Sequence, residues 1–346
     1  MSSPVTAETT LMFREAAAAG AAVRRQQARG GRTLAALAER LRGAPPRAVV
    51  TLARGSSDNA ATFARYLIER RVRVLTSSIA PSIASVYDAM PDLAGTMMLA
   101  ISQSGRSPDL LAAAEAAKAR GALVVALVNE EGSPLAATAD FCLPLCAGAE
   151  RSVAATKSFI ATLAAIVSLI GGWTGDVRFQ SAFEALPDLL DRAWALDWSP
   201  AVPVLAEATD LYVVGRGPGY AIAQEAALKI KETCGFHAEA FSAAEVRHGP
   251  MALVENGFPV LLLGQADRSL DGIAALGREF GERGARLIRA GVPGVAGTGL
   301  PTIDADPLVQ PILLIQSFYR LANALAVARG RDPDRPPHLA KVTETV

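Results

Sequence analysis

The first residues that could do chemistry are polar side chains at the end of an apolar run. The stretch "LAISQSGRSPDLLAAA" spans residues 99–114. Its polar side chains include Ser102, Gln103, Ser104 and Ser107. A strand that ends here, with Ser107 as N-cap and Pro108 at the first helical position, would direct hydroxyls and backbone N–H groups to one place. Because such helix starts bind anions, the stretch predicts a site for a small phosphate monoester.

A second loop with hydroxyl groups strengthens this prediction. The segment "ARGSSDN", residues 53–59, follows an earlier apolar run and would place Ser56 and Ser57 at the same edge of a sheet. Either loop alone is typical of ordinary helix caps. The first loop lacks the lysine of the G-x-x-x-x-G-K-[ST] pattern, so a nucleoside triphosphate is not expected.

Titratable side chains gather in the second half, in "EAALKIKETCGFHAEAFSAAEVRHGP". Lys229 and Glu232 are three residues apart and would share one helix face, where the ordinary interpretation is a surface ion pair. His248 precedes a glycine and a proline that would end a short helix and fix the imidazole; a structural histidine is the alternative. Lys341 lies in "RPPHLAKVTETV", a tail without periodicity that would ordinarily be disordered.

The elements that position these residues follow an α/β pattern. Short apolar runs alternate with alanine-rich runs, which predicts parallel sheets flanked by helices. Strands are expected at residues 48–53, 72–78, 96–102 and 122–128. Helices are expected within residues 7–43, about 154–194 and about 309–328.

The pattern then starts again, which indicates an internal duplication. Gly217 follows Gly55 by 162 residues, and Gln265 follows Gln103 by the same 162. Equal spacing at two separate motifs favours a duplicated domain. The predicted organisation is a helical segment 1–45, a first domain with linking helices 46–195, a second domain 196–330 and a C-terminal tail 331–346.

Composition limits the possible partners. The chain has 346 residues, of which 51% are hydrophobic, and its 34 basic and 34 acidic residues give no support to a nucleic-acid or membrane partner. The N-terminus lacks the pattern of a signal peptide, so a cytoplasmic location is expected. The apolar run 159–173 is shorter than the roughly 20 residues of a membrane span and predicts a core helix. Three cysteines form no four-ligand pattern, and neither a metal nor a cofactor is expected.

Six segments, in this order, resemble the tandem sugar-isomerase (SIS) module of glucosamine-6-phosphate synthase and its relatives. They are "ARGSS", "SQSGRS", "ERSVAATKSF", "EAALKIKE", "HAEAFSAAEVRHGP" and "HLAKVT". The resemblance implies two flavodoxin-like SIS domains and a site for a hexosamine or hexose 6-phosphate. The implied substrate contacts are Ser56, Ser57, Ser102, Gln103, Ser104, Ser107, Val153 and Ala155.

The resemblance also implies catalytic roles. Glu232 would move a proton between C1 and C2, and His248 would assist ring opening. Lys229 and Lys341 would contact the open-chain sugar. In relatives the histidine comes from the neighbouring subunit, which implies a homodimer with a shared active site.

Departures from the family pattern shape the predicted activity. The synthase carries a glutaminase with a cysteine directly after the initiator methionine, where this chain has Ser2, so ammonia release from glutamine is not expected. Arg106 stands where the synthase loop has glutamate, Arg54 replaces a cysteine, and Ala155 replaces a serine contact. Substrate contacts near the amino group are therefore expected to differ.

The sequence predicts a SIS-type glucosamine-6-phosphate deaminase that yields fructose 6-phosphate and ammonia. The same catalytic set would serve an aldose-ketose isomerase, an aminotransferase-like isomerase without its glutaminase, a galactosamine-6-phosphate deaminase or a fructosamine-6-phosphate deglycase. A non-catalytic sugar-phosphate sensor is a more distant alternative, and the presence of Glu232, His248 and Lys341 favours an enzyme.

Overall fold

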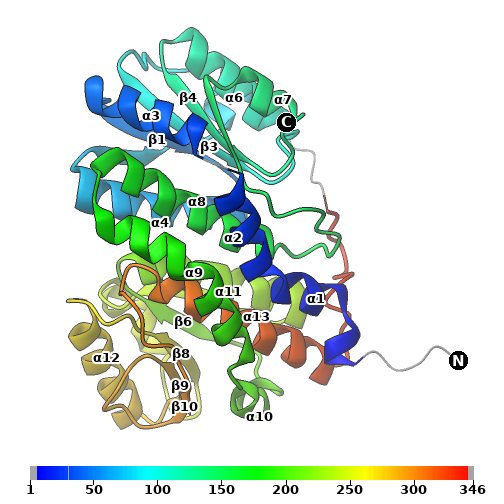
Figure 1. Cartoon of the computed structure of the whole chain (residues 1–346). Helices are drawn as coiled ribbons and strands as arrows, with labels where there is room; N and C mark the ends of the chain where they lie inside the picture. Colours follow the sequence, from blue (N-terminus) through cyan, green and yellow to red (C-terminus); the bar gives the residue numbers. More distant parts are fainter. Residues whose placement is uncertain (1–5, 30, 342–346) are drawn as a thin grey trace, which may run out of the picture. The chain divides into compact units, whose positions relative to one another are not determined.

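The computed structural model describes residues 6–29 and 31–341, and the chain is traced in Figure 1. Its described residues divide into two compact units. The first-sheet unit comprises those within 21–150, 157–185 and 340–346; the second-sheet unit comprises those within 1–20, 151–156 and 186–339. The predicted domain boundaries stay a prediction, and segments 1–45 and 331–346 extend beyond the described residues.

The first-sheet unit is built on five parallel strands in the order β2-β1-β3-β4-β5. The strands are β1 Ala48–Leu52, β2 Leu75–Ser78, β3 Thr96–Ser102, β4 Leu123–Val128 and β5 Phe141–Pro144. Every residue of β3, the central strand, is buried. A continuous apolar run is what a parallel strand covered on both faces requires.

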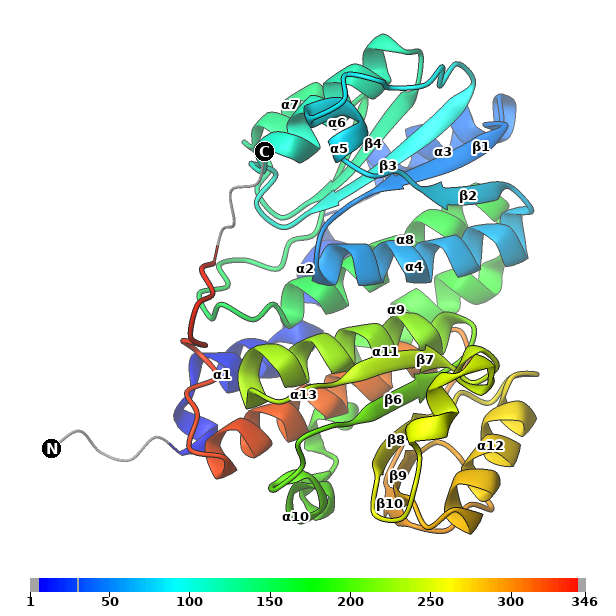
Figure 2. The same cartoon turned by 180° about the vertical axis from the view of Figure 1, so that it is seen from behind.

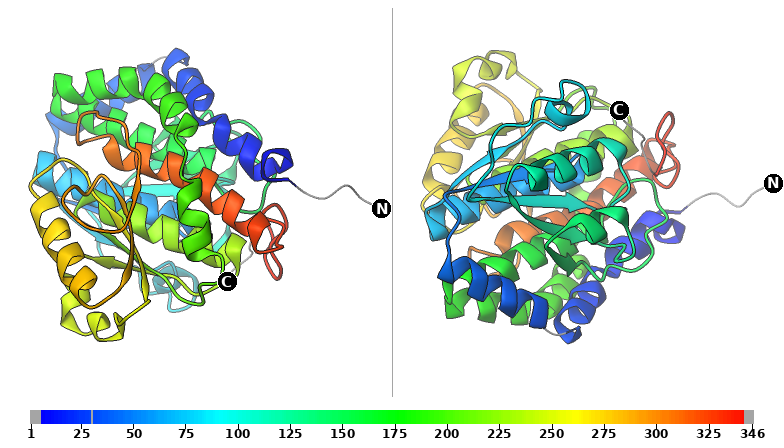
Figure 3. Two further views of the ribbon diagram at one scale, coloured as in Figure 1. Left: turned by 90° about the horizontal axis from the view of Figure 1, so that it is seen from below. Right: turned by 90° about the horizontal axis from the view of Figure 1, so that it is seen from above.

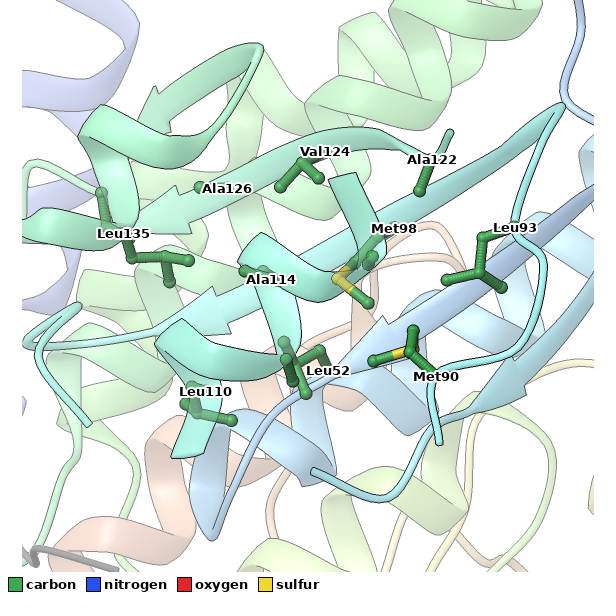
Figure 4. Packing of buried hydrophobic residues seen from close by; sticks show 14 residues of the cluster. Leu52, Met90, Leu93, Met98, Leu110, Ala114, Ala122, Val124, Ala126 and Leu135 are labelled. Atoms are coloured by element: carbon green, nitrogen blue, oxygen red, sulfur yellow. The ribbon is translucent and has the colours of Figure 1, made fainter. Parts of the chain in front are cut away.

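Helices cover both faces of this sheet. The helices of this unit are α2 Ala19–Ala28, α3 Arg32–Gly43, α4 Ser56–Leu67, α5 Ser82–Ser85, α6 Pro108–Ala119, α7 Pro134–Thr138 and α8 Lys157–Thr174, and the helix α9 Val177–Ala195 is divided between the two units. Figure 2 shows α5 and α6 on one face and α4 and α8 on the other, and Figure 3 shows the same layers from two further sides. Leu110 and Ala114 of α6 belong to one apolar cluster with Leu52 and Met98 of the sheet (Figure 4).

The second-sheet unit repeats this architecture. Its parallel strands are β6 Tyr212–Gly215, β7 Glu239–Ser242, β8 Pro259–Leu263, β9 Arg286–Ala290 and β10 Thr298–Leu300, in the order β7-β6-β8-β9-β10. Its helices are α1 Leu11–Ala17, α10 Val202–Leu205, α11 Pro218–Lys229, α12 Leu270–Glu282 and α13 Gln310–Ala328. Short 3₁₀ turns occur at Ala7–Thr9, Ser199–Ala201, Glu245–His248 and Pro250–Leu253.

The predicted α/β fold with two related, flavodoxin-like sheets is confirmed. Both sheets have the same strand order when their strands are numbered from the first of each, and that order is the flavodoxin-like one. Gly55 and Gly217, 162 residues apart, have φ values of +56° and +59°. A single wide π-type turn ends α4 at Ile68–Val72 and α11 at Ile230–Cys234, again 162 residues apart.

Most predicted elements are found, with local differences. The strand expected at 72–78 begins only at Leu75, because residues 68–72 extend the preceding helix and the chain reverses at Arg73, whose φ is +65°. The helical region predicted over residues 7–43 is divided into the 3₁₀ turn Ala7–Thr9 and the helices Leu11–Ala17, Ala19–Ala28 and Arg32–Gly43. The helices Lys157–Thr174 and Gln310–Ala328 are long and apolar enough for a membrane span, but 78% of each is buried inside the protein, as in a core helix.

Candidate active site

The loop between β3 and α6, residues 103–107, is held by hydrogen bonds to Ser102 of β3 and to α7. The Ser102 hydroxyl accepts the Gly105 N–H at 3.0 Å, and the Gly105 carbonyl accepts the Leu135 N–H at 3.2 Å. Gly105 has a φ of +62°, and a Cβ there would lie 2.2 Å from Ser133 Oγ. The loop shape therefore depends on glycine at this position.

The hydroxyls of this loop stand at the start of α6, a helix of 12 residues. Ser107 occupies the predicted N-cap position, but its side chain makes no capping hydrogen bond. Ser104 Oγ accepts the Arg106 N–H at 3.4 Å, and a hydroxyl that accepts can still donate. Gln103 is half-buried in the same loop. These donors and the positive end of the helix suit an anionic oxygen.

The second hydroxyl loop leads to the same sheet edge. Ser56 and Ser57 are half-buried in the first turn of α4, after Gly55. Strands β1 and β3 are neighbours, with β2 beyond β1 and β4 beyond β3. The edge between β1 and β3 is thus the topological switch point, where ligands bind in open α/β sheets.

Lys229 and Glu232 form the predicted ion pair, but the pair is buried rather than on the surface. Lys229 Nζ contacts the Glu232 carboxylate and lies 3.5 Å from Glu225 Oε1, which also accepts the Tyr319 hydroxyl at 3.1 Å. The side chains of Lys229 and Glu225 are 1% and 0% exposed, whereas that of Glu232 is 21% exposed. Glu232 is therefore the carboxylate of this cluster that a ligand could reach.

The cluster keeps Lys229 charged. Burial alone would lower the pKa of Lys229, but the charges of Glu225 and Glu232 and their hydrogen bonds outweigh burial and raise it above the ordinary value. A fixed ammonium therefore stands beside the Glu232 carboxylate. Glu232 itself lies in the π-type turn Ile230–Cys234, and the first repeat has the same turn at Ile68–Val72.

Sequence reasoning missed two members of this cluster. Glu225 precedes Lys229 by four residues on α11, a spacing that could have predicted the contact. Tyr319 comes from α13, 94 residues further along the chain, and no local pattern points to it.

The structure places His248 at the end of the 3₁₀ turn Glu245–His248, where it is exposed. Gly249 follows with a φ of +136°, so the predicted stop after the histidine is present. The Tyr212 hydroxyl donates to the Pro250 carbonyl at 3.1 Å and ties the following turn to the sheet.

The remaining predicted residues lie on irregular segments. Lys341 Nζ lies 3.7 Å from Glu150 Oε2, and the buried Glu150 carboxylate also accepts the Ser158 hydroxyl. The Val153 N–H donates to the Asp334 carbonyl at 3.4 Å, and Ala155 is half-buried.

The predicted site residues divide between the two units. The first-sheet unit holds Ser56, Ser57, Ser102, Gln103, Ser104, Ser107 and Lys341, and the second-sheet unit holds Val153, Ala155, Lys229, Glu232 and His248.

Two cavities lie elsewhere. One of about 910 Å³ in the first-sheet unit is lined partly by α2, α3, α8 and α9, and one of about 410 Å³ in the second-sheet unit lies beside β9 and α13. Neither is lined by a predicted site residue. Within residues 6–29 and 31–341, no group of three His, Cys, Asp or Glu side chains is placed to hold a metal ion.

Comparison with known sequences finds one family. The SIS domain family model matches residues 44–171 and 204–289. A glutamine–fructose-6-phosphate aminotransferase of Aeropyrum pernix is 35% identical over 308 residues, which cover 83% of this chain and 49% of that protein. One from Zymomonas mobilis is 34% identical over 311 residues, 85% of this chain and 51% of that protein. The chain thus spans about half the length of these relatives.

Solved structures of similar shape cover nearly the whole chain. A protein of Silicibacter pomeroyi, provisionally named a phosphosugar isomerase, is 39% identical with a TM-score of 0.90, covering 94% of this chain and 100% of that one. The C-terminal domain of a Francisella tularensis glucosamine-fructose-6-phosphate aminotransferase is 26% identical, with a TM-score of 0.83 and coverage of 95% and 98%. A glucosamine-6-phosphate deaminase of Thermotoga maritima shares the fold at 23% identity, with a TM-score of 0.76 and coverage of 97% and 100%.

Proposed function

The chain belongs to the SIS domain family, and on this premise we propose that it is a glucosamine-6-phosphate deaminase. It would convert glucosamine 6-phosphate and water to fructose 6-phosphate and ammonia. The observation that carries the proposal is the cluster in which Glu232, partly exposed, stands beside the buried ammonium of Lys229. A carboxylate held in this way can move a proton between adjacent sugar carbons.

The proposed reaction begins with ring opening, assisted by His248. Glu232 then removes the C2 proton, and the C–H electrons form the C1–C2 double bond of an enolamine while the C1–O1 π electrons move to O1, which takes up a proton. Return of the proton to C1 gives an imine at C2. Water adds to this carbon and ammonia leaves, so water is the only second substrate and no nitrogen donor is required.

The substrate would bind by its phosphate at the switch point of the first sheet. Donors for the phosphate are Ser102, Gln103, Ser104 and Ser107, with Ser56 and Ser57 from the neighbouring loop. Val153, Ala155 and Lys341 would contact the open-chain sugar, whereas the buried Lys229, which the resemblance also assigns to the sugar, would act through the Glu232 carboxylate beside it. The support for this placement is the hydroxyl-bearing loop, the uncommitted Ser107 side chain and the helix start behind it.

One assay separates this reaction from its alternatives. Ammonia and fructose 6-phosphate release would be measured across glucosamine, galactosamine and fructosamine 6-phosphates, with Glu232→Gln as the control for contaminating activity. Release from glucosamine 6-phosphate supports the proposal. Preference for another amine identifies a galactosamine-phosphate deaminase or a deglycase, ketose formation without ammonia identifies an isomerase, and binding without turnover identifies a sensor. Net synthesis of glucosamine 6-phosphate from fructose 6-phosphate and ammonia would favour an isomerase that works in the synthetic direction.

We also propose that the enzyme acts as a cytoplasmic homodimer with a shared site, without nucleic-acid or membrane partners. If His248 serves the neighbouring subunit, each site needs two chains. Mixing inactive His248→Ala and Glu232→Gln proteins after dissociation should then restore activity in some heterodimer sites. Heterodimers that form but stay inactive would contradict the shared site.

A further inference from the structure

An arginine–aspartate pair joins the two hydroxyl loops of the first sheet. Arg54 leaves β1 just before α4, and Asp109 lies in the first turn of α6. Arg54 Nε and one terminal amino nitrogen donate to Asp109 Oδ2 at 3.0 Å and 2.8 Å. Asp109 Oδ1 accepts the Leu110 N–H at 2.8 Å. The carboxylate therefore fixes the guanidinium group across the two loops.

This pair lies at the switch point itself. In the parallel register, Leu52 of β1 stands beside Ala100 of β3, so Arg54 and Ser102, each two residues further on, leave the same level of the sheet. The guanidinium group reaches the first turn of α6, which follows the loop of Ser104 and Ser107 directly. Arg54 is thus positioned beside the hydroxyls proposed to hold the phosphate.

The pair is unequally exposed. The Asp109 side chain is 0% exposed, whereas that of Arg54 is 52% exposed. A guanidinium group has five N–H donors, and this pair uses two, which leaves three for other acceptors. Solvent screens the exposed side of the guanidinium group, and its remaining donors are open to a ligand.

From this geometry we propose that Arg54 is a further substrate-binding residue, held in place by Asp109, that binds the phosphate at the β3–α6 loop. The inference rests on the proposed function only in placing a sugar phosphate at this loop. The planar fork of an arginine suits phosphate oxygens, and a side chain already held by a buried carboxylate loses little freedom on binding.

Direct binding of inorganic phosphate to the full chain, measured by calorimetry, tests the inference without relying on turnover. Arg54→Ala should weaken phosphate binding by about tenfold to a hundredfold, and Arg54→Lys should weaken it less. Arg65→Ala is the matched control: Arg65 is also 52% exposed and pairs with Glu69 at 3.9 Å, but at the far end of α4. The phosphate affinity of the Arg65→Ala variant should stay within twofold of that of the wild type.

A second variant guards against unfolding. Arg54→Ala leaves Asp109 buried without its cation, so Arg54→Ala combined with Asp109→Asn removes the unpaired charge and should show the same loss of phosphate binding. With the sugar substrate, KM should rise while kcat changes little. Wild-type phosphate affinity in either folded variant would overturn the inference. A wild-type protein that binds no phosphate would overturn both the loop and Arg54, whereas phosphate binding without deamination would overturn only the proposed reaction.

Discussion

Replacing Glu232 by glutamine tests whether this carboxylate moves the proton. The change keeps the side-chain shape and an oxygen that can accept from Lys229, but it removes the base. Exchange of the C2 proton with solvent deuterium should fall by about a hundredfold or more. Lys229 would still have Glu225 at 3.5 Å, so its buried charge keeps a carboxylate and the protein should remain folded.

The expected cost in stability follows from the same contacts. The bond from Lys229 to Glu232 changes from one between two charged groups to one with a neutral acceptor. Hydrogen bonds to charged groups contribute about 1.5–3 kcal/mol and neutral ones about 0.5–1.5 kcal/mol, so the free energy of unfolding should fall by about 1 kcal/mol. Loss of exchange far beyond this small loss of stability would identify a chemical role.

Glu225→Gln provides the matched control. It makes the same chemical change beside the same Lys229, but the Glu225 side chain is fully buried and cannot reach a substrate. Stability should again fall by about 1–2 kcal/mol, while exchange stays within about tenfold of the wild type. Mass spectrometry of the recovered sugar and urea unfolding measure the two effects. Wild-type exchange in Glu232→Gln, or equal loss in a folded Glu225→Gln, would refute the assignment of Glu232 as the base.

Three further predictions concern the loop between β3 and α6 and the buried Lys229. Alanine at both Ser104 and Ser107 should raise KM for phosphorylated substrates, each lost bond costing about 1.5–3 kcal/mol; unchanged steady-state KM in the folded protein would place the phosphate elsewhere. Gly105→Ala forces a Cβ to within 2.2 Å of Ser133 Oγ, so urea unfolding should show that the free energy of unfolding falls by about 1–3 kcal/mol. Wild-type stability would show that the loop can change its conformation to accommodate the Cβ. Folding raises the pKa of Lys229, so the stability that its charge contributes is fully present below the unfolded pKa of about 10.4 and is lost as pH rises through the folded pKa. Urea unfolding midpoints should therefore fall at alkaline pH. Lys229→Met should remove the part of this decrease that comes from Lys229.

The long strands and the duplication could be predicted because they leave local patterns. Each of β1, β3 and β4 is an apolar run, and the starts of two helices carry glycine in the same rare conformation. The edge strands β5 and β7 have only four residues each, too few for a clear period. Their positions depend on pairing with β4 and β6, and the local sequence does not predict which strands pair.

The side-chain partners of the site are harder to predict, because they join distant segments. The spacing of Lys229 and Glu232 predicts a contact but not its burial, which depends on elements such as α13. Arg54 and Asp109 are 55 residues apart, and only the neighbouring positions of β1 and β3 bring them together. The local sequence of the Ser104 loop, which has its own arginine at position 106, therefore does not point to Arg54.

The two repeats differ at the positions proposed to do chemistry. Asp267 of the second repeat corresponds to Gly105 of the first, since the difference is 162. The Asp267 carboxylate accepts the Ser269 N–H at 2.8 Å and the Ser269 hydroxyl at 2.6 Å. In the second loop, the Asp267 carboxylate thus already accepts the N–H and hydroxyl of Ser269. Ala266 stands where the first loop has Ser104, so that hydroxyl is missing. An incoming phosphate would meet a negative charge where the first loop has only a glycine.

The proton-transfer pair, Lys229 and Glu232, is present only in the second repeat. Lys229 and Glu232 correspond, at the same offset, to Leu67 and Arg70 of the first repeat, so the first repeat has neither the ammonium nor the carboxylate. The wide turn after the helix is kept in both repeats, which shows that the turn itself is a property of the fold and not of the chemistry. Each repeat therefore carries a different part of the proposed machinery: the hydroxyl loop in the first and the proton-transfer pair in the second.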